Sequence, residues 1–494
     1  MAFCLRVAAA SLALSSLVSG LLDRPSPACQ NLTTSLGVEK IAVSQLDIRY
    51  INSRTSYWNT KLDAHAPACI VFPENAEDVS WVLKVVKATG SRFAIKTTGH
   101  NTNDLFSSVD KDGVLIDLSH MTAKYYDPST TLATYEPGSK WGQLYDYYAQ
   151  FDRTVVGGRV YDVGTGLALG GGMSYLSPQY GMACDSFREL EVVLPSGEIV
   201  TASETEKPDL FFGLRGGGGN AYGVVTKYTV QSRPAAGKNF YAGNILYIFD
   251  HHEAILNATR DFILYNTDPK AAILMNFNVL TTPDLDFGLD QACLMFLVYD
   301  GPDPGDAFKN FTAIPHLLNT MGLKTYSQVA NMPIPKLAIL SRADNIFRVG
   351  VHRADGDSYR TAFERFYAWA QEHKGDYTYI HLDYNPVPKS LTDASEAQGG
   401  NAMEMPDGPW FWAEYTLTTP PLISQERYDR IQASFKALVD GTPNAKGLPF
   451  FLNEAHADQD ALKTFSSYDR LQEIKRKYDP DDFFANKTGG WSFS

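Results

Sequence analysis

Glycine marks three short segments in the first half of the chain: TTGH at 97–100, GGRVYDVGTGLALGGG at 157–172 and GLRGGGG at 213–219. Glycine has no Cβ and tolerates positive φ, so successive backbone amides in such loops can surround an anion. Each glycine can also serve only as a turn residue, without any ligand. The surrounding sequence must therefore decide between a phosphate-binding site and a set of tight turns.

Two common nucleotide-binding motifs do not fit these segments. A Rossmann dinucleotide site needs G-x-G-x-x-G between a strand and a helix. Here Gly164 and Gly166 are followed by Gly170, one residue too late, and the chain has no regular doubly wound repeat. A P-loop needs Gly-Lys-Ser/Thr after its glycines, and no such triplet follows them. The sequence disfavours a nicotinamide-dependent Rossmann enzyme and excludes a P-loop.

Alternating strands and helices surround the glycine segments. Val79, Val82, Leu83 and Val86 recur at spacings of three and four, which predicts one buried helix face. We expect short strands before this helix and again around 92–96 and 114–118, as in α/β or α+β folds. Residues 189–194 and 198–202 flank a Pro-Ser-Gly turn and are expected to form a hairpin. Proline and small residues at 233–238 predict a domain boundary.

The first 20 residues have the layout of a secretory signal peptide, with Arg6, an apolar stretch at 7–17 and small residues at 19 and 20. The stretch is shorter than the roughly 20 residues that span a bilayer, so a membrane anchor is the less favoured alternative. No later apolar run approaches that length, and we expect a soluble mature protein. Sequons at Asn31, Asn257, Asn310 and Asn486 fit a secreted glycoprotein.

Charge argues against nucleic acid and anionic membranes as partners. The chain has 43 Lys plus Arg and 56 Asp plus Glu, a formal net charge of −13 at pH 7. That charge would repel phosphate backbones and acidic lipid headgroups. We assign no metal site.

Four cysteines remain once the expected signal peptide is removed: Cys29, Cys69, Cys184 and Cys293. Cys29 and Cys69 flank the first ordered-looking segment, and in an oxidising compartment a bridge between them would pin the amino terminus onto the domain. We favour that pairing. Four cysteines allow three connectivities, and some or all thiols could instead be free and buried.

Several segments together resemble one known family, the secreted fungal and plant flavoproteins of the berberine bridge enzyme type, which belong to the vanillyl-alcohol oxidase superfamily. The resemblance is specific over 65–235 and at the carboxy-terminal tail, and weak over 240–440. The segments that carry it are FPENAEDVSWVLKVV, IKTTGHN, VGGRVYDVGTGLALGGGMSYLSPQYGMACD, LEVVLPSGEIVTAS, DLFFGLRGGGGNAYGVVTKYTV and YDRLQEIKRKYDPDDFF.

The resemblance implies an α+β fold. After the signal peptide at 1–20, it implies a two-subdomain PCMH-type FAD-binding domain at 64–235. A substrate domain at 236–445 would hold an antiparallel sheet covered by helices, and a segment at 446–494 would return to the FAD domain.

The same resemblance implies FAD as the cofactor, joined covalently through His100 to the flavin 8α-methyl group. An imidazole nitrogen is a suitable nucleophile for that bond, although a turn histidine with ordinary hydrogen bonds is the plainer interpretation of His100 alone. The other residues expected to bind FAD are Thr97, Thr98, Gly99, Asn101, Gly157, Gly158, Gly164, Gly166, Gly170, Gly171, Gly172, Tyr180, Gly181, Val225 and Asn486.

The chain departs from the family pattern at two positions in the glycine run. Many relatives carry a second flavin link through cysteine in C-x-x-V-G-x-G-G, but here Val160 replaces the cysteine and Leu167 the last glycine. We therefore expect a single covalent bond. The family position of Asn486 lies near the cofactor, so we expect that sequon to stay unglycosylated.

A polar strand face supplies the first candidates for the catalytic base. Tyr377, Tyr379, His381 and Asp383 alternate along YTYIHLD and would share one face of a strand. A face turned to solvent is the alternative, since antiparallel sheets often expose one polar face. The corresponding strand in the family commonly lines the substrate cavity, which favours His381 and Asp383 as catalytic residues.

The second set of candidates lies in Asn453-Glu454-Ala455-His456. Glu454 and His456 would share a face if the segment is extended. Many relatives have Asn-Tyr at the first two positions, with the tyrosine as a catalytic phenol, and here Glu454 replaces it. Glu454 could act as the base or only bind the substrate, and Glu414 is a third candidate.

These features together predict a secreted FAD-dependent oxidase that acts on an alcohol, phenol or amine of a small organic molecule, with dioxygen as the acceptor. An oligosaccharide oxidase is one alternative, disfavoured because those relatives usually have the cysteine that Val160 replaces. A non-redox cyclase or binding protein that uses FAD as a scaffold is another. Glycans are expected at Asn31, Asn257 and Asn310.

Overall fold

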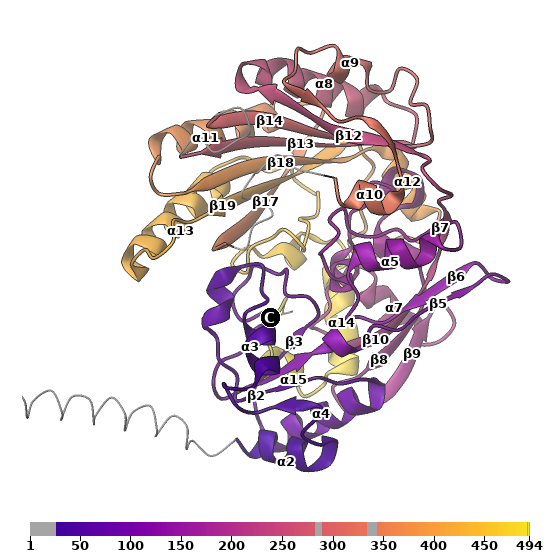
Figure 1. The fold of residues 1–494 in the computed structure, drawn as a ribbon, viewed down its shortest axis with the longest axis vertical. Coiled ribbons are helices and arrows are strands. Elements are labelled where there is room, and N and C mark those ends of the chain that lie inside the picture. Colours follow the sequence, from indigo (N-terminus) through magenta and orange to yellow (C-terminus); the bar gives the residue numbers. More distant parts are fainter. Residues whose placement is uncertain (1–25, 282–288, 333–342, 492, 494) are drawn as a thin grey trace, which may run out of the picture.

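The computed structural model describes residues 26–281, 289–332, 343–491 and 493, so the expected signal peptide at 1–20 lies outside the described residues. Two lobes lie one above the other in Figure 1, with the carboxy-terminal segment returning to the lower one. The lower lobe contains a four-stranded and a five-stranded sheet, and the upper lobe contains an eight-stranded sheet. The protein has the mixed α+β fold predicted from its sequence.

The four-stranded sheet has the order β1-β2-β4-β3, with parallel pairing among β2, β4 and β3. Its strands are β1 (Ile41–Ala42), β2 (Cys69–Val71), β3 (Phe93–Lys96) and β4 (Val114–Asp117). The parallel crossover between β2 and β3 is helix α4 (Ala76–Thr89), which the apolar spacing predicted. Asn75 caps its start by accepting from the amide of Asp78, and Gly90 ends it with φ 67°.

The amino-terminal segment is held onto this sheet by a disulfide. Helix α2 (Pro27–Leu36) carries Cys29, which is bonded to Cys69 of β2, so the predicted pairing is confirmed. Cys184 and Cys293 are free and buried. The short helix α3 (Ile48–Arg54) follows in the same region.

The five-stranded sheet is antiparallel, with the order β5-β6-β10-β8-β9. Its strands are β5 (Lys124–Asp127), β6 (Leu132–Tyr135), β8 (Phe187–Val193), β9 (Ile199–Ser203) and β10 (Val224–Gln231); β7 (Arg153–Thr154) pairs separately with β11 (Arg233–Pro234). The helices nearby are α5 (Trp141–Ala149), α6 (Ser177–Tyr180) and α7 (Pro208–Leu214). Strands β8 and β9 form the hairpin predicted around Pro195.

The eight-stranded sheet, called here the large sheet, is antiparallel throughout the described residues, with the order β15-β12-β14-β13-β18-β19-β17 and β16 paired to β12. Its strands are β12 (Phe240–Ile248), β13 (Ala271–Leu280), β14 (Gln291–Asp300), β15 (Leu318–Asn319), β16 (Gly322–Lys324), β17 (Asn345–Arg353), β18 (Tyr379–Val387) and β19 (Trp410–Thr418). The accompanying helices are α8 (His252–Tyr265), α9 (Lys309–Thr312), α10 (Tyr326–Ala330), α11 (Ser358–Glu372), α12 (Lys389–Glu396) and α13 (Gln425–Asp440).

Both faces of β13, β18 and β19 are buried. Helices α8, α11 and α13 cover the outer face (Figure 1), where Met275, Leu382 and Tyr415 join Phe363 and Phe435 in one hydrophobic cluster. Side chains alternate along a strand, so the neighbouring residues of the same strands point toward the lower lobe. This inner face of the large sheet is the one that carries polar groups.

The tail crosses back to the lower lobe. Helix α14 (Tyr468–Tyr478) lies beside α7, and α15 (Phe483–Lys487) follows it. Phe483 and Phe484 both contact the ring of Phe93 on β3, with centroid distances of 5.3 Å. The last segment of the chain is therefore part of the core built by the first strands.

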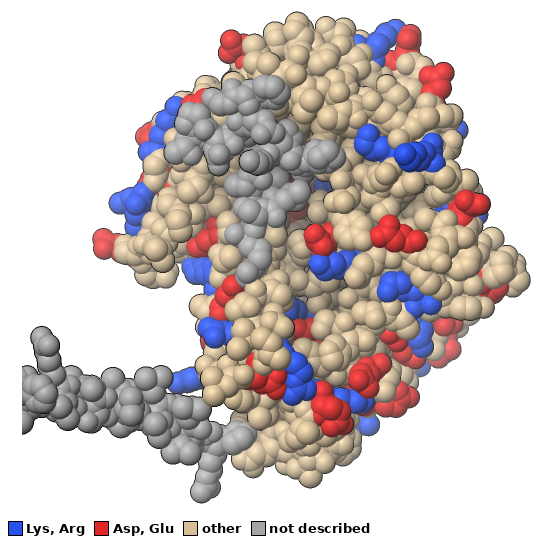
Figure 2. Space-filling model, in the orientation of Figure 1, with Lys and Arg blue, Asp and Glu red and all other residues tan. Residues whose placement is uncertain are grey.

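Lys and Arg side chains are interspersed with Asp and Glu on the face drawn in Figure 2. None of the helices in the described ranges combines the length and apolar character needed to cross a membrane. Within the same ranges, no group of three or more His, Cys, Asp and Glu side chains is arranged to hold a metal ion.

Candidate active site

A cavity of about 630 Å³ lies between the two lobes. Its walls include β3 and the loop after it, the 157–172 glycine run, the segment 218–225 that begins at the end of the third glycine segment, the inner face of the large sheet, and the tail. The residues that line it include Trp58, Thr97, Thr98, Gly99, His100, Asn101, Arg159, Val160, Gly164, Gly166, Gly170, Tyr175, Val225, Asn276, His381, Asp383, Glu414, Asn453, Glu454 and Trp491. The cavity thus brings together sequence motifs that lie far apart in the chain, from Trp58 to Trp491.

The loop after β3 brings His100 to the cavity. Gly99 has φ +80° at the turn, and its carbonyl accepts from the amide of Trp58 at 2.9 Å. The rings of Trp58 and His100 are stacked, with centroids 6.0 Å apart. Burial lowers the pKa of His100 to about 4, so its imidazole is neutral near pH 7 and one ring nitrogen keeps a free lone pair.

Gly164 and Gly170 of the 157–172 run line the cavity at positions that leave no room for a side chain. A Cβ on Gly164 would lie 2.5 Å from Thr98 Oγ1, and one on Gly170 would lie 2.6 Å from Asn453 Oδ1. The amide of Asn453 donates to the carbonyls of Leu167 at 3.0 Å and Gly170 at 3.1 Å, which ties the tail to this wall. A cavity of this volume with glycine-rich segments on one wall suits a large cofactor with phosphates, and FAD fits that description.

Only part of the expected cofactor set lies on the cavity wall. Thr97, Thr98, Gly99, His100, Asn101, Gly164, Gly166, Gly170 and Val225 line it, whereas Gly157, Gly158, Gly171, Gly172, Tyr180, Gly181 and Asn486 do not.

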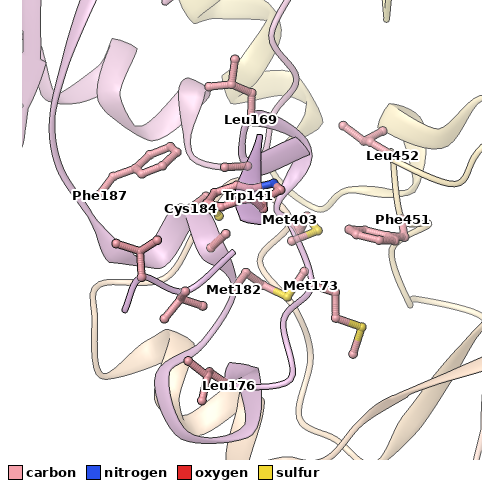
Figure 3. Packing of buried hydrophobic residues seen from close by; sticks show 14 of the residues in the cluster. Trp141, Leu169, Met173, Leu176, Met182, Cys184, Phe187, Met403, Phe451 and Leu452 are labelled. Carbon is pink, nitrogen blue, oxygen red and sulfur yellow. The ribbon is translucent and has the colours of Figure 1, made fainter. Parts of the chain in front are cut away.

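Gly157, Gly158 and Gly171 meet side chains of the core instead. A Cβ on Gly157 would lie 2.1 Å from the ring of Trp141, and one on Gly158 would lie 2.5 Å from it. A Cβ on Gly171 would lie 2.8 Å from the methyl group of Met403. Figure 3 shows Trp141, Met182, Cys184, Met403 and Phe451 among the buried side chains of one hydrophobic cluster. These glycines provide space for packing, so their expected direct role in cofactor binding has no support here.

Gly172, Tyr180 and Gly181 contact other parts of the chain and do not line the cavity. A Cβ on Gly172 would lie 2.8 Å from Ala183, and one on Gly181 would lie 2.6 Å from Asp185. The ring of Tyr180 is covered by the guanidinium of Arg233, with Cζ 4.3 Å from the ring centroid.

Asn486 lies on α15 with its side chain exposed, which removes the reason to expect a silent sequon. The tail instead reaches the cavity through Trp491, whose ring contacts Phe106 edge-on at 5.3 Å. The amide of Asn220 fixes this part of the tail by donating to the carbonyl of Gly489 at 2.9 Å.

Polar side chains form a row across the inner face of the large sheet. Asn276 on β13 pairs with Asp383 on β18, and Asp383 pairs with Glu414 on β19. Asn276 donates from Nδ2 to Asp383 Oδ1. His381 lies one inward position earlier on β18, with Nε2 3.8 Å from Asp383 Oδ1. The face is buried, so the solvent-exposed alternative for this strand is wrong.

Tyr377 does not belong to this row. The strand begins at Tyr379, and the Tyr377 hydroxyl donates to the carbonyl of Ala370 at 2.8 Å on the outer, helix-covered side. The alternation therefore holds for Tyr379, His381 and Asp383 only.

Glu454 and His456 do not share a face, contrary to the expectation for an extended segment. Residues 452–454 form a turn in which the Glu454 amide donates to the carbonyl of Phe451 at 3.1 Å, so the period of two does not apply. Glu454 points into the cavity. His456 points away and bonds Asp458 at 2.9 Å, outside the cavity wall. His456 is therefore not placed to act on a substrate in this cavity.

Burial strongly perturbs the three carboxyl groups of the cavity. It raises the pKa of Asp383 and of Glu454 well above their usual range, and Glu414 raises both further. Burial also raises the pKa of Glu414, which Arg159 opposes. His381 is shifted the other way, because burial lowers its pKa to about 3. The cavity thus combines acids that retain protons with a histidine that stays neutral.

Two polar atoms on this face have no hydrogen-bond partner within the described residues. They are Oδ1 of Asn276 and Nδ1 of His381, both fully buried. A buried polar atom without a partner lowers the stability of the protein. A polar group of a ligand in the cavity would therefore gain by forming a hydrogen bond with either atom.

Sequence reasoning missed several residues of this site, among them Asn276, Asn385 and Arg159. Asn276 alternates with Asn278 in the otherwise apolar strand AAILMNFNVL, a signal that could have been used. Asn385 continues the predicted face of β18 by one more alternate position. Arg159 is the only charged residue of the glycine run besides Asp162, but no local pattern shows where its side chain goes.

Comparisons with known proteins agree with this geometry. Residues 67–203 match the profile of the FAD binding domain, and residues 451–489 match that of the berberine and berberine like family. An uncharacterized FAD-linked oxidoreductase of Arthroderma benhamiae is 32% identical over 501 residues and covers 96% of each chain. An FAD-dependent monooxygenase of Arthrobotrys oligospora is 30% identical over 86% of this chain and 81% of its own.

Among solved structures, the xylooligosaccharide oxidase of Myceliophthora thermophila superimposes on this chain with a TM-score of 0.75. It covers 93% of this chain and 98% of its own, at 20% sequence identity, so this likeness concerns the fold alone.

Proposed function

Because the chain belongs to the berberine bridge enzyme-like family of FAD-linked oxidoreductases, we propose that it is a secreted oxidase of a small organic molecule. The group oxidised is an alcohol, a phenol or an amine, and dioxygen is the acceptor of the electrons. FAD is held by the lower lobe and linked through His100.

The observation that supports this proposal best is that His100 and the carboxyl groups of the large sheet face the same cavity. When bound, FAD accepts a hydride at its ring, which is chemistry that no side chain supplies. The chain must remove the proton that leaves the substrate hydroxyl or amine in the same reaction. A carboxyl group takes up that proton only in its ionised form, and a raised pKa then strengthens its hold on the proton; Asp383 and Glu454 are the candidates for this role.

The covalent link is supported by the state of His100. A neutral imidazole with a free nitrogen can attack an electrophilic carbon, whereas a protonated one cannot. Val160 lines the cavity at the position where many relatives have the second linking residue, and valine forms no such bond. One covalent bond is therefore the expected maximum.

Aromatic and apolar side chains suit a small organic substrate. Trp58, Tyr175, Phe296, Phe347 and Phe451 line the cavity along with the polar row. Binding pockets for small molecules typically combine apolar walls with a few placed polar groups. Asn276 and His381 supply such groups from the large sheet.

Three other functions are alternatives to this proposal. An oligosaccharide oxidase shares this fold, but Val160 replaces the cysteine usual in that group. A non-redox cyclase or binding protein would use FAD as a scaffold only. Monooxygenation is a further possibility raised by the name of the Arthrobotrys relative, and it differs from oxidation in that an oxygen atom enters the product.

Anaerobic mixing separates these functions. The purified flavoprotein is mixed without oxygen with a panel of alcohols, phenols, amines and oligosaccharides while the oxidised flavin band is recorded. Bleaching of the band, followed by hydrogen peroxide release on admission of air, supports an oxidase. Product formation without bleaching would instead establish a scaffold role, and ¹⁸O from labelled dioxygen in the product would establish a monooxygenase.

Secretion is part of the proposal and rests on separate observations. The Cys29–Cys69 disulfide suits an oxidising compartment. Asn31 and Asn310 are exposed and accessible to glycosylation, whereas Asn257 is half-buried and its Oδ1 accepts from Arg360 at 3.1 Å. Recovery of the protein from the culture medium, cleaved near residue 20, would support secretion, and an intracellular uncleaved chain would contradict it.

A further inference from the structure

Three buried carboxyl groups meet at one end of the cavity. Asp383 and Glu414 pair across β18 and β19, all three carboxyl groups line the cavity, and Glu414 raises the pKa of both Asp383 and Glu454. Buried carboxyl groups that interact in this way do not all ionise together, because like charges repel. Interacting acids of this kind titrate as a set, so the relevant quantity is the number of negative charges on the cluster.

One cation reaches this carboxyl cluster, defined as Asp383, Glu414 and Glu454. Arg159 leaves the glycine run and donates from Nη2 to Glu454 Oε1 at 3.5 Å. It also donates from Nη1 to Asn385, whose Nδ2 donates to Glu454 Oε2 at 3.2 Å. The Arg159 side chain is only 15% exposed. The guanidinium thus joins the lower lobe to the large sheet and to the tail at a single point.

The other groups that face Arg159 and the cluster do not compete with it. Burial lowers the pKa of His381 to about 3, so the imidazole is neutral. Burial raises the pKa of the phenols of Tyr175, Tyr326 and Tyr379, so these are neutral as well. Among the described residues that line the cavity, the other cation is Lys140, which pairs with Asp162 and is 40% exposed.

We propose that Arg159 sets how many carboxyl groups of the cluster are ionised and thereby keeps one carboxylate available as the base. Arg159 is a positioning residue, because it acts through Glu454 and its neighbours. Its effect on the charge of the cluster does not depend on any reaction. Its role in supplying the base rests on the proposed oxidase function.

A packing role for Arg159 predicts a different result from a charge-setting role. Loss of packing destabilises the protein by a similar amount at every pH. Loss of the positive charge raises the pKa of the cluster further, typically by about 1 to 3 units for a neighbouring cation. When the pKa of a carboxyl group is higher in the folded than in the unfolded protein, the protein loses stability as pH rises from the unfolded pKa to the folded pKa. If Arg159 sets the charge of the cluster, the stability lost on removing its positive charge must therefore grow with pH.

Thermal unfolding of the flavin-loaded protein tests the charge-setting role directly. The proteins compared are wild type, Arg159→Gln, Arg159→Lys, Glu454→Gln and the double variant Arg159→Gln/Glu454→Gln, each from pH 5 to pH 8. We expect the Tm deficit of Arg159→Gln to be small at pH 5 and to widen toward pH 8. Arg159→Lys keeps the charge and should show a smaller widening.

The double variant distinguishes charge balance from lost contacts. Removing one carboxyl group together with the arginine should restore most of the Tm lost at pH 8, because the cluster then has one negative charge fewer to bury without a cation. If Arg159→Gln alone does not fold, the double variant should still do so. A deficit that is constant over pH, or a double variant no more stable than Arg159→Gln, would overturn the proposal.

A second measurement concerns the base itself. The rate of anaerobic flavin reduction should rise with pH as the base ionises, and Arg159→Gln should move that rise about 1 to 3 units upward while Arg159→Lys moves it less. If the pH dependence of this rate is the same in Arg159→Gln as in wild type, Arg159 has no role in supplying the base. Should no substrate reduce the flavin, the proposed function fails while the unfolding experiment still decides the charge-setting role.

Discussion

Asp383 and Glu414 stand directly opposite each other on the neighbouring antiparallel strands β18 and β19. Like charges in opposed positions destabilise a sheet, and here both side chains are also buried. The pair is compatible with a stable sheet only if it carries fewer than two negative charges. A protein retains such an arrangement for chemistry rather than for stability, which motivates the first of the following predictions.

Replacing the acids that face the cavity should slow flavin reduction without loss of folding. We expect Asp383→Asn or Glu454→Gln to reduce the rate of anaerobic flavin reduction by at least about 10²-fold, because a positioned base contributes about 10² to 10⁴. Stopped-flow absorbance at the flavin band measures this rate. Glu364→Gln, an exposed position on α11, is the matched control and should leave it unchanged. Wild-type rates in both cavity variants would locate the base elsewhere, with Glu414 next in line.

Removal of His100 should abolish the covalent attachment of the flavin. We expect wild-type protein to stay yellow after acid precipitation and to show a fluorescent band on a denaturing gel, and His100→Ala to lose both signals. No second link is available because Val160 carries no nucleophile. Acid-stable flavin in the His100→Ala variant, or complete release of FAD from wild type, would refute the assignment.

The Cys29–Cys69 bridge should contribute substantially to stability. It spans 40 residues and fastens α2 to β2, an inner strand of the four-stranded sheet. Loss of a native bridge typically costs about 2–4 kcal/mol, so we expect the double variant Cys29→Ser/Cys69→Ser to unfold at a clearly lower temperature. Scanning calorimetry measures the difference. Peptide mapping without reductant that recovers both cysteines as free thiols would show that the bridge does not form.

Stability should also depend on His65 in the alkaline range. Its Nε2 contacts Asp104 at 2.5 Å and its Nδ1 contacts Asp110 at 2.7 Å, and these bonds raise the pKa of His65 to about 9. A raised histidine pKa stabilises the fold fully below the unfolded value of about 6.5, and the contribution disappears as pH rises through about 9.

His65→Gln should therefore lower the Tm relative to wild type at pH 6, with the gap closing toward pH 10. The exposed His120 lies outside this cluster, and His120→Gln is the control that should show no such trend. A gap that stays constant across this range would mean that His65 contributes through packing alone.

The local elements could be predicted from the sequence because their signals are local. Helix α4 combines apolar spacing with a capping asparagine and a terminal glycine, and it begins and ends where those residues lie. The inward face of β18 follows from simple alternation from Tyr379 onward. Alternation fails for Tyr377 because the strand begins two residues after it, and a boundary of that kind has no sharp sequence signal.

The composition of the site could be predicted only in part. His456 was misplaced because alternation was applied to a segment that forms a turn. Gly157 and Gly158 make room for Trp141, and sequence alone does not distinguish such a glycine from one that makes room for a ligand. Arg159 contacts Asn385 and Glu454, which lie 226 and 295 residues away in the chain, so nothing near it in sequence predicts its role.

The hydrogen bond from Asn453 to the carbonyl of Gly170 spans 283 residues and joins the tail to the glycine wall. During synthesis, the glycine run emerges long before its partner does. The cavity therefore remains open on one side until residue 453 has been synthesised and has folded back. We expect flavin capture to follow translation, so that a chain ending at residue 445 would accumulate without bound flavin even though every glycine segment and His100 are present.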